Sequence, residues 1–217
     1  RRVLFRSPLG PQTVMGADCA LFVNRLGEDD RPDLMYHTYQ LPFTFNTERL
    51  GYPVPDDRYC ICMTPNIPRT KSRGRLWLLS KNPDIKPAID FGYFTDPDGY
   101  DEQTIVDGLE IAREVAATGP FKDWIKREIA PGPAITSRPD LSTYGRAVHH
   151  TVYHPLGGCK IGAVEDPTTV VGPDLKVKGV DGLRVADGAI FPALTTVNPV
   201  VGILMIGEKC ADLILNP

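Results

Sequence analysis

Residues 154–162 read HPLGGCKIG and decide how the rest of the chain is interpreted. Three glycines and one proline fall within these nine residues, so the stretch specifies a backbone path more than a packed surface. His154 opens it, and histidine is the side chain whose ordinary pKa lies nearest neutrality, which suits proton transfer. For an isolated histidine on a glycine turn, however, a structural role is the better explanation. The residues that follow His154 along the chain have to decide between proton transfer and a structural role.

Two short motifs lie C-terminal to this stretch. Asp187 and Gly188 end a predicted strand, and Asn198 and Pro199 directly precede a predicted helix over residues 200–215. Helix N-termini present unpaired N–H groups and a positive potential, and an asparagine amide can both donate and accept hydrogen bonds. Each motif also has a simple structural explanation: a tight turn for the first, and an N-cap followed by proline for the second.

The chain before residue 153 has a different character. Short runs rich in aromatic and β-branched residues predict strands, and together they indicate an antiparallel sheet; they are residues 19–24, 34–44, 59–63, 76–80 and 87–90. Apolar residues at helical spacing predict a helix over residues 102–118, with Asp101 as its N-cap. We also expect helices over residues 122–129 and 140–148, and a boundary near Tyr153.

Composition excludes several classes of function. The 217 residues carry 24 basic and 27 acidic side chains, and a net charge of −3 provides no field to gather nucleic acid or an anionic membrane. No stretch approaches the roughly 20 apolar residues of a membrane span. Five cysteines are an odd number, which favours a reducing compartment, so we expect a cytoplasmic protein with neither nucleic-acid nor membrane partners.

Metal and nucleotide motifs do not emerge from the spacing. His149, His150, His154 and Cys159 show no zinc-type spacing, so we expect no metal site. Cys60 and Cys62 alternate along one predicted strand, which is typical of core thiols. There is no G-x-S-x-G elbow and no phosphate-binding glycine loop. The chain opens with Arg1 rather than methionine, which predicts a truncated start, and we treat residues 1–16 as an uncertain remnant.

The order of these motifs resembles the glucose–methanol–choline (GMC) family of flavin oxidoreductases. The residues that carry the resemblance are HPLGGCKIG at 154–162, DLKVK at 174–178, GLRVAD at 182–187, VNP at 197–199 and MIGEKCADL at 205–213. Within that family the chain is most similar to choline oxidases and their relatives, through residues 33–37, 72–74, 93–99 and 151–155.

The resemblance implies a mixed α+β and α/β architecture. Residues 17–153 would form part of an antiparallel-sheet substrate-binding domain with helices, and residues 154–217 would return to complete a Rossmann-like FAD-binding domain. The glycine loop of the family lies upstream of the residues present here. The resemblance thus implies a C-terminal portion, and the 217 residues alone would be inactive.

The resemblance also implies a reaction and its residues. FAD would take a hydride from the carbon of an alcohol, choline or another primary alcohol, and O₂ or another acceptor would reoxidise it. His154 would be the acid–base group, Asn198 its partner at the alcohol oxygen, and His37 a further active-site histidine. Asp187, Gly188, Asn198, Pro199 and Val200 would contact FAD. A hydroxynitrile-lyase activity on the same scaffold is the alternative, and whether the protein forms a homodimer stays open.

Overall fold

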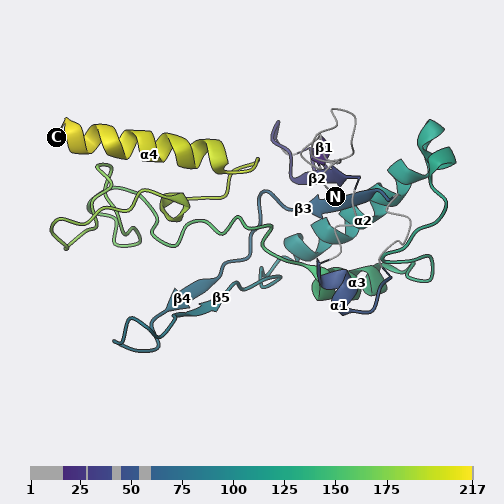
Figure 1. The fold of residues 1–217 in the computed structure, drawn as a ribbon, viewed down its shortest axis with the longest axis horizontal. Coiled ribbons are helices and arrows are strands. Elements are labelled where there is room, and N and C mark those ends of the chain that lie inside the picture. Colours follow the sequence, from purple (N-terminus) through teal and green to yellow (C-terminus); the bar gives the residue numbers. More distant parts are fainter. Residues whose placement is uncertain (1–16, 28, 41–44, 54–59, 217) are drawn as a thin grey trace, which may run out of the picture. The chain divides into compact units, whose positions relative to one another are not determined.

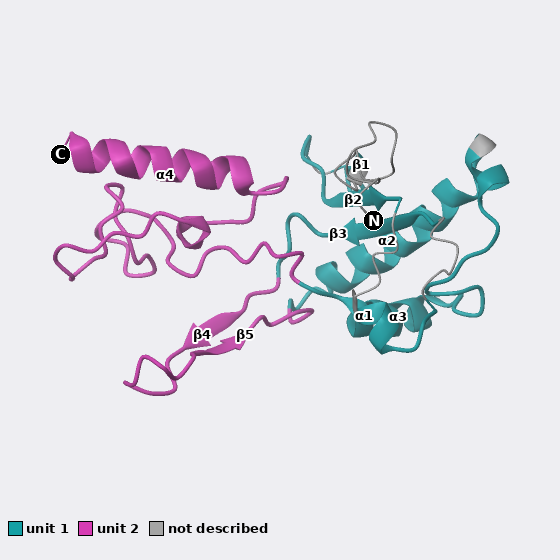
Figure 2. Cartoon of the chain, in the orientation of Figure 1, with its two compact units in different colours: residues 1–71, 96–150 teal, residues 72–95, 151–217 magenta. Residues whose placement is uncertain are grey.

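The computed structural model describes residues 17–27, 29–40, 45–53 and 60–216, and the chain divides into two compact units. Unit 1 comprises residues 1–71 and 96–150, and unit 2 comprises residues 72–95 and 151–217 (Figure 2). The predicted remnant at 1–16 and the end of the predicted strand at 41–44 lie outside the described residues.

A three-stranded antiparallel sheet forms one layer of unit 1. Strands β1 (Ala17–Val23), β2 (Leu34–Tyr39) and β3 (Cys62–Asn66) lie in the order β1-β2-β3, which confirms the predicted antiparallel sheet. Pro65 lies inside β3, opposite Tyr36, whereas the predicted strand ended at residue 63. An outer strand tolerates proline because its open side pairs with no other strand. A missing backbone N–H on that side therefore removes no hydrogen bond from the sheet.

Helix α2 (Tyr100–Ala116) covers one face of this sheet. Tyr36 is fully buried and its hydroxyl donates to the carbonyl oxygen of Gly108 at 2.6 Å. A Cβ atom at Gly108 would lie 2.7 Å from Cβ of Pro65, so only glycine lets the helix approach β3 this closely. The sheet therefore has an α2 face and an opposite face, and alternate strand residues point to each.

Two further helices complete unit 1. Helix α3 (Arg138–Val148) packs against α2, and the short helix α1 (Phe45–Arg49) contacts α3 (Figure 1). The predicted helix at 140–148 is confirmed, whereas α1 was not foreseen. The predicted helix at 122–129 is wrong. The chain makes a 3₁₀ turn over Gly119–Trp124 and then extends from Ile125. The Trp124 side chain is 83% exposed, so a helix there would have no packing to stabilise it.

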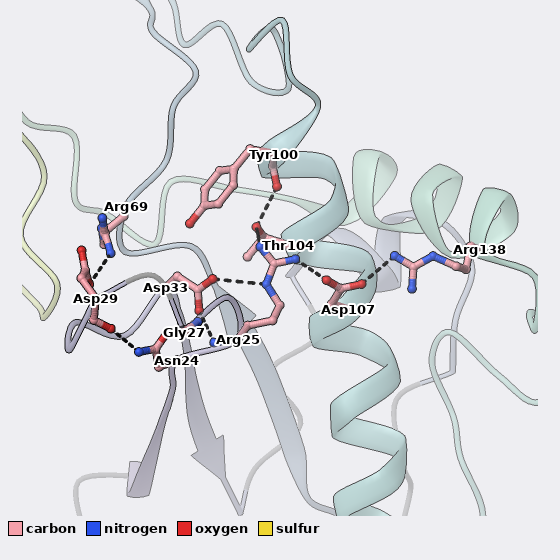
Figure 3. A network of polar contacts seen from close by, with 10 residues as sticks. All are labelled: Asn24, Arg25, Gly27, Asp29, Asp33, Arg69, Tyr100, Thr104, Asp107 and Arg138. Carbon is pink, nitrogen blue, oxygen red and sulfur yellow. Dashed lines mark hydrogen bonds and ion pairs between the residues drawn. The ribbon is translucent and has the colours of Figure 1, made fainter.

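A polar network ties the β1–β2 connection to α2 (Figure 3). The Arg25 guanidinium bonds Asp33 at 3.3 Å and Thr104 Oγ1 at 2.7 Å, and it also pairs with Asp107 of α2. Asp107 in turn accepts from Arg138 of α3 at 2.6 Å. The Arg25 and Asp33 side chains are only 11% and 3% exposed, so their charges are satisfied by each other rather than by water.

The start of α2 differs from the prediction. Gly99, with φ +65°, occupies the N-cap position that we assigned to Asp101. Asp101 is instead buried in the first turn, where it accepts from the Thr70 hydroxyl and from the backbone N–H of Lys71 at 2.8 Å. An aspartate in the first turn still favours the positive end of the helix, so the sequence signal had a real cause but a shifted position.

Unit 2 contains a hairpin, a long irregular segment and one helix. Strands β4 (Arg75–Trp77) and β5 (Ala88–Asp90) pair antiparallel, and α4 (Val200–Leu215) has the bounds predicted from the sequence. A 3₁₀ turn, η2 (Gly188–Ile190), precedes α4 in the sequence and helps to form a small core. The buried members of this core are Val171, Leu175, Ile190, Ile206 and Cys210.

The partition into units differs from the predicted domains in one respect. We expected residues 17–153 to belong together, but the hairpin segment 72–95 groups with the C-terminal part. The assignment of a substrate-binding and a cofactor-binding domain to these parts stays a prediction. None of the described helices combines the length and apolar character needed to cross a membrane.

Candidate functional site

His154 follows a tight bend in unit 2. Val152 and Tyr153 both adopt left-handed backbone conformations, with φ +51° and +62°, which non-glycine residues rarely do. The His154 N–H then donates to the Thr151 carbonyl at 3.1 Å, which closes the bend. The imidazole is half-buried, and burial lowers its pKa from the ordinary 6.5. Burial thus favours the neutral form of His154, which is the form that can accept a proton.

The glycine-rich stretch after His154 runs beside the turn after Asp187. The backbone N–H groups of Gly157, Cys159 and Ile161 donate to the carbonyl oxygens of residues 188–190 at 3.2, 2.8 and 2.9 Å. Alternate residues of one segment thus pair in order with successive residues of the other. Two motifs that lie about 30 residues apart in the sequence are fixed together by the backbone alone.

Gly188 joins this pair of segments to α4. A Cβ atom there would lie 2.7 Å from Cδ2 of Leu156 and 3.3 Å from Cδ1 of Ile203, so a side chain would force the three segments apart. Phe191 makes a second junction, because its ring would lie 2.8 Å from a Cβ at Gly202 of α4. The structure therefore brings the His154 loop, Gly188 and the first turns of α4 together within unit 2.

Asp187 caps the 3₁₀ turn that follows it. Its Oδ1 accepts from the backbone N–H of Ala189 at 2.7 Å, while the residue as a whole is exposed. This bond fixes the turn that presents Gly188 to its neighbours. The tight-turn explanation thus holds for Asp187, and its contact with a cofactor stays a prediction.

Exposed side chains surround the N-terminus of α4, and no side chain caps its first turn with a hydrogen bond. Pro199, not Asn198, occupies the N-cap position, and its ring cannot accept a hydrogen bond from the first turn. Val200 and Val201 of that turn are 59% and 75% exposed. Asn198 is also exposed and lies immediately before this helix end. Pro199 itself is buried, so the first turn of α4 presents exposed side chains beside the asparagine amide while its N-cap residue is covered.

His37 lies on β2 in unit 1, on the face of the sheet opposite α2. Its neighbours Leu34 and Tyr36 contact α2, and strand alternation turns His37 the other way. The Asn66 side-chain nitrogen lies 3.2 Å from His37 Nδ1. The Tyr39 ring lies 6.1 Å from the imidazole, and burial raises the pKa of Tyr39.

The predicted site residues divide between the two units. His154, Asp187, Gly188, Asn198, Pro199 and Val200 belong to unit 2, where the contacts of Gly188 and Phe191 connect their segments. His37 belongs to unit 1, and its surroundings are those of the sheet. The sequence analysis missed Asn66, although the alternating pattern of β2 and β3 places it on the His37 face.

Cys60 and Cys62 are half-buried rather than core thiols. In the part of the chain that the structure describes, no three His, Cys, Asp or Glu side chains gather into a group able to hold a metal ion.

Known proteins with similar sequences are longer than this chain. A choline oxidase from Arthrobacter globiformis is 42% identical over 209 residues, which cover 96% of this chain and 38% of that protein. The chain therefore spans about two fifths of the length of this curated relative.

Solved structures show the same fold. The pyridoxine 4-oxidase from Mesorbium loti has a TM-score of 0.80 at 23% identity, over 95% of this chain and 39% of that one. A formate oxidase of Aspergillus oryzae, studied for modification of its FAD, has a TM-score of 0.75 at 24% identity, over 85% of this chain and 32% of that one.

The model of one protein family covers most of the chain. It is described as GMC oxidoreductase and matches residues 70–207, a span that includes the His154 loop, Gly188 and the first turns of α4. This match agrees with the resemblance carried by the order of the sequence motifs. The chain belongs to the GMC oxidoreductase family.

Proposed function

We propose that the protein carrying this chain oxidises an alcohol, choline or another primary alcohol, with FAD as the hydride acceptor. The observation that carries the proposal is the junction in unit 2, where backbone pairing and Gly188 hold the His154 loop against the start of α4. A proton acceptor and a helix N-terminus are thereby held in one compact structure. Membership of the GMC family and similarity to a choline oxidase support the same reaction.

The residues of unit 2 fit a flavin. FAD, when bound, supplies the acceptor for the hydride, and a reduced flavin gains negative charge. The N-terminus of α4 offers N–H groups and positive potential that would stabilise such charge. We assign Pro199 and Val200 at this helix end, together with Asp187 and Gly188 at the neighbouring turn, to contact with the cofactor.

His154 serves as the proton acceptor in this proposal. An alcohol gives up a hydride readily only as its hydroxyl loses a proton, so a base must face that oxygen. The neutral imidazole of His154, whose pKa burial lowers, is suited to take that proton. Asn198 cannot act as a base, and its amide N–H would instead hold the alcohol oxygen in place. His37, which belongs to unit 1, is proposed as a further hydrogen-bonding histidine of the reaction.

The decisive experiment is anaerobic flavin bleaching in the FAD-loaded protein that contains this chain. Choline and a panel of other primary alcohols should bleach the oxidised flavin, and His154→Ala should slow bleaching by about 10²–10⁴-fold, the usual contribution of a general base. His150→Ala is the matched control, since burial and the neighbouring His149 also lower the pKa of His150, yet His150 is not among the proposed site residues. Bleaching of His154→Ala at the wild-type rate would contradict the proposal.

The pH profile provides an independent check. Only neutral His154 can accept a proton, so the bleaching rate should be constant at neutral pH and fall as the pH drops through the His154 pKa, below 6.5. Admission of O₂ after bleaching, with peroxide measured, then decides between oxygen and another acceptor.

A further inference from the structure

The Asn66 side chain contacts one ring nitrogen of His37, Nδ1. The two residues come from adjacent strands: Asn66 pairs with Met35, and His37 pairs with Thr64, so Asn66 and His37 are diagonal neighbours on one face. The Asn66 Nδ2 atom lies 2.7 Å from the Thr64 carbonyl oxygen, 3.2 Å from His37 Nδ1 and 3.4 Å from the Met35 carbonyl oxygen.

These three neighbours fix which end of the amide faces them. Backbone carbonyl oxygens only accept hydrogen bonds, so the end of Asn66 that lies between two of them must be the NH₂ group. If the amide were reversed, its oxygen would lie against two carbonyl oxygens and gain no bond. The NH₂ group therefore also faces Nδ1 of His37, and that nitrogen must accept.

A hydrogen bond accepted at Nδ1 determines where the imidazole proton lies. In neutral histidine one ring nitrogen carries the proton and the other accepts. With Nδ1 occupied as an acceptor, the proton lies on Nε2, and Nε2 is a donor. The hydrogen-bond partner of one ring nitrogen thus determines whether the other nitrogen donates or accepts. The same relation holds in histidines that bind metals or act in catalysis.

We propose that Asn66 is a positioning residue that fixes His37 as the Nε2–H tautomer, so that His37 acts as a hydrogen-bond donor and not as a base. The role in catalysis rests on the proposed alcohol oxidation. In that reaction a histidine with its proton on Nε2 would donate a hydrogen bond to an oxygen on which negative charge develops, rather than take a proton. The tautomer itself follows from the contacts within unit 1 alone.

The chain offers a matched control for Asn66. The Nδ2 atom of Asn46 also donates to two backbone carbonyls, those of Val148 and His149, at 3.2 and 2.8 Å. Asn46 lies in the same unit and makes the same kind of bonds, and the bonds described for it end on backbone oxygens rather than on an imidazole nitrogen. Loss of a carbonyl-bonding amide can therefore be separated from loss of the bond to His37.

The first test is nitrogen NMR of the histidine side chains in the full 217-residue chain, at about pH 8.5, about two units above the ordinary histidine pKa. We expect Nε2 of His37 to carry the proton and Nδ1 to show an acceptor shift. Asn66→Ala should move both signals toward the average of the two tautomers, Asn66→Asp should transfer the proton to Nδ1, and Asn46→Ala should change neither.

A proton on Nδ1 of wild-type His37, or unchanged His37 signals in Asn66→Ala, would overturn the proposal. The wild-type spectrum alone decides the tautomer, so the test survives a variant that fails to fold. In the FAD-loaded protein, Asn66→Ala should slow flavin bleaching at saturating alcohol about tenfold, the effect of one lost hydrogen bond, and Asn46→Ala should not. A wild-type flavin that no alcohol bleaches would refute the proposed function while leaving the tautomer result intact.

Discussion

Helices α2 and α4 have nearly the same length, 17 and 16 residues, but they are held in different ways. Helix α2 contacts the buried Tyr36 and Pro65 through Gly108, and its Asp107 joins the network around Arg25. Helix α4 has only two buried residues, Ile206 and Cys210, while much of its apolar surface is exposed; the exposed apolar side chains include Val200, Val201, Leu204 and Met205.

The comparison separates what stabilises a helix from what makes it useful. Helix α2 is held within unit 1 both by close packing and by ion pairs, so we expect its stability to depend on particular residues. Contacts on α4 form a narrow stripe, which leaves side chains of its first turn exposed beside Asn198. Exposed, weakly packed elements are often the ones that carry function. Substitutions that affect α2 and α4 unequally test this contrast.

Removal of the Arg25 side chain should have the largest effect. Arg25→Ala leaves Asp33 and Asp107 without their shared cation in a largely buried setting, and we expect a loss of about 3 kcal/mol in the free energy of unfolding of unit 1. Arg31→Ala is the control, because Arg31 pairs with Asp29 while 63% exposed, and its loss should cost much less than that of Arg25. Urea titrations followed by NMR signals of α2 and α4 amides measure both. Equal losses for Arg25→Ala and Arg31→Ala would show that burial of the network does not matter.

Alanine in place of glycine should have opposite effects in the two helices. Gly108→Ala places a methyl group 2.7 Å from Pro65 and should destabilise α2 by about 1–3 kcal/mol. At Gly207 of α4 nothing lies within 4 Å, so Gly207→Ala should stabilise α4 by about 0.5–1 kcal/mol through helix propensity. Amide-resolved urea titrations give the sign for each helix. The same sign at both sites would mean that α2 does not approach β3 as closely as described.

Local signals explain how much of this fold could be predicted. The apolar spacing of residues 102–118 gave α2, and the Asn-Pro start gave the bounds of α4, because helix periodicity and termination are written in neighbouring residues. The predicted helix at 122–129 failed for the opposite reason: Trp124, its largest apolar side chain, is 83% exposed and is not covered by another element. Pro65 in β3 depended on the position of that strand in the sheet, which no local pattern specifies.

Long-range pairing explains what could not be predicted of the site. The motif order brought attention to His154, Gly188 and Asn198, but not to the hydrogen bonds between residues 157–161 and 188–190 that hold two of these segments together. Those bonds join backbone atoms, so they leave little trace in side-chain chemistry. Asn66 was missed because its role depends on strand register, and a shift of one residue would turn it to the α2 face.

Removal of the Tyr36 hydroxyl should have a moderate effect that is confined to unit 1. Tyr36→Phe keeps the buried ring but loses the bond to the Gly108 carbonyl, and we expect a loss of about 1 kcal/mol for α2 amides. Met205→Ala, at an exposed position of α4, should change α4 by about 0.5 kcal/mol or less. A larger effect of Met205→Ala than of Tyr36→Phe would reverse the contrast between the two helices.

Acid should weaken the two helices differently, and the difference should depend on salt. Burial alone would raise the pKa of Asp107, but hydrogen bonds from Arg138 and Arg25 and their charges outweigh it and hold the pKa below the ordinary 3.8. A carboxyl group with a depressed folded-state pKa contributes stability above its unfolded pKa, and this stability is lost as the pH falls from 3.8 through the folded value. The stability of α2 should therefore decline over that range, and Asp107→Asn should reduce the decline; the rest would come from groups such as Glu102, whose pKa the hydrogen bond from Arg146 also lowers.

Asp212 of α4 is the exposed counterpart. The hydrogen bond from Lys209 lowers its pKa, followed by that from Asn216, but its side chain is 51% exposed whereas that of Asp107 is 25% exposed. Salt screens exposed charges more than partly buried ones, so raised ionic strength should abolish the acid sensitivity of α4 and leave most of that of α2. Urea midpoints of α2 and α4 amides, measured across the acid range at low and high salt, test this. Equal screening in both helices would show that the Arg25 network is as solvated as a surface ion pair, and the difference between the two helices would then be one of packing alone.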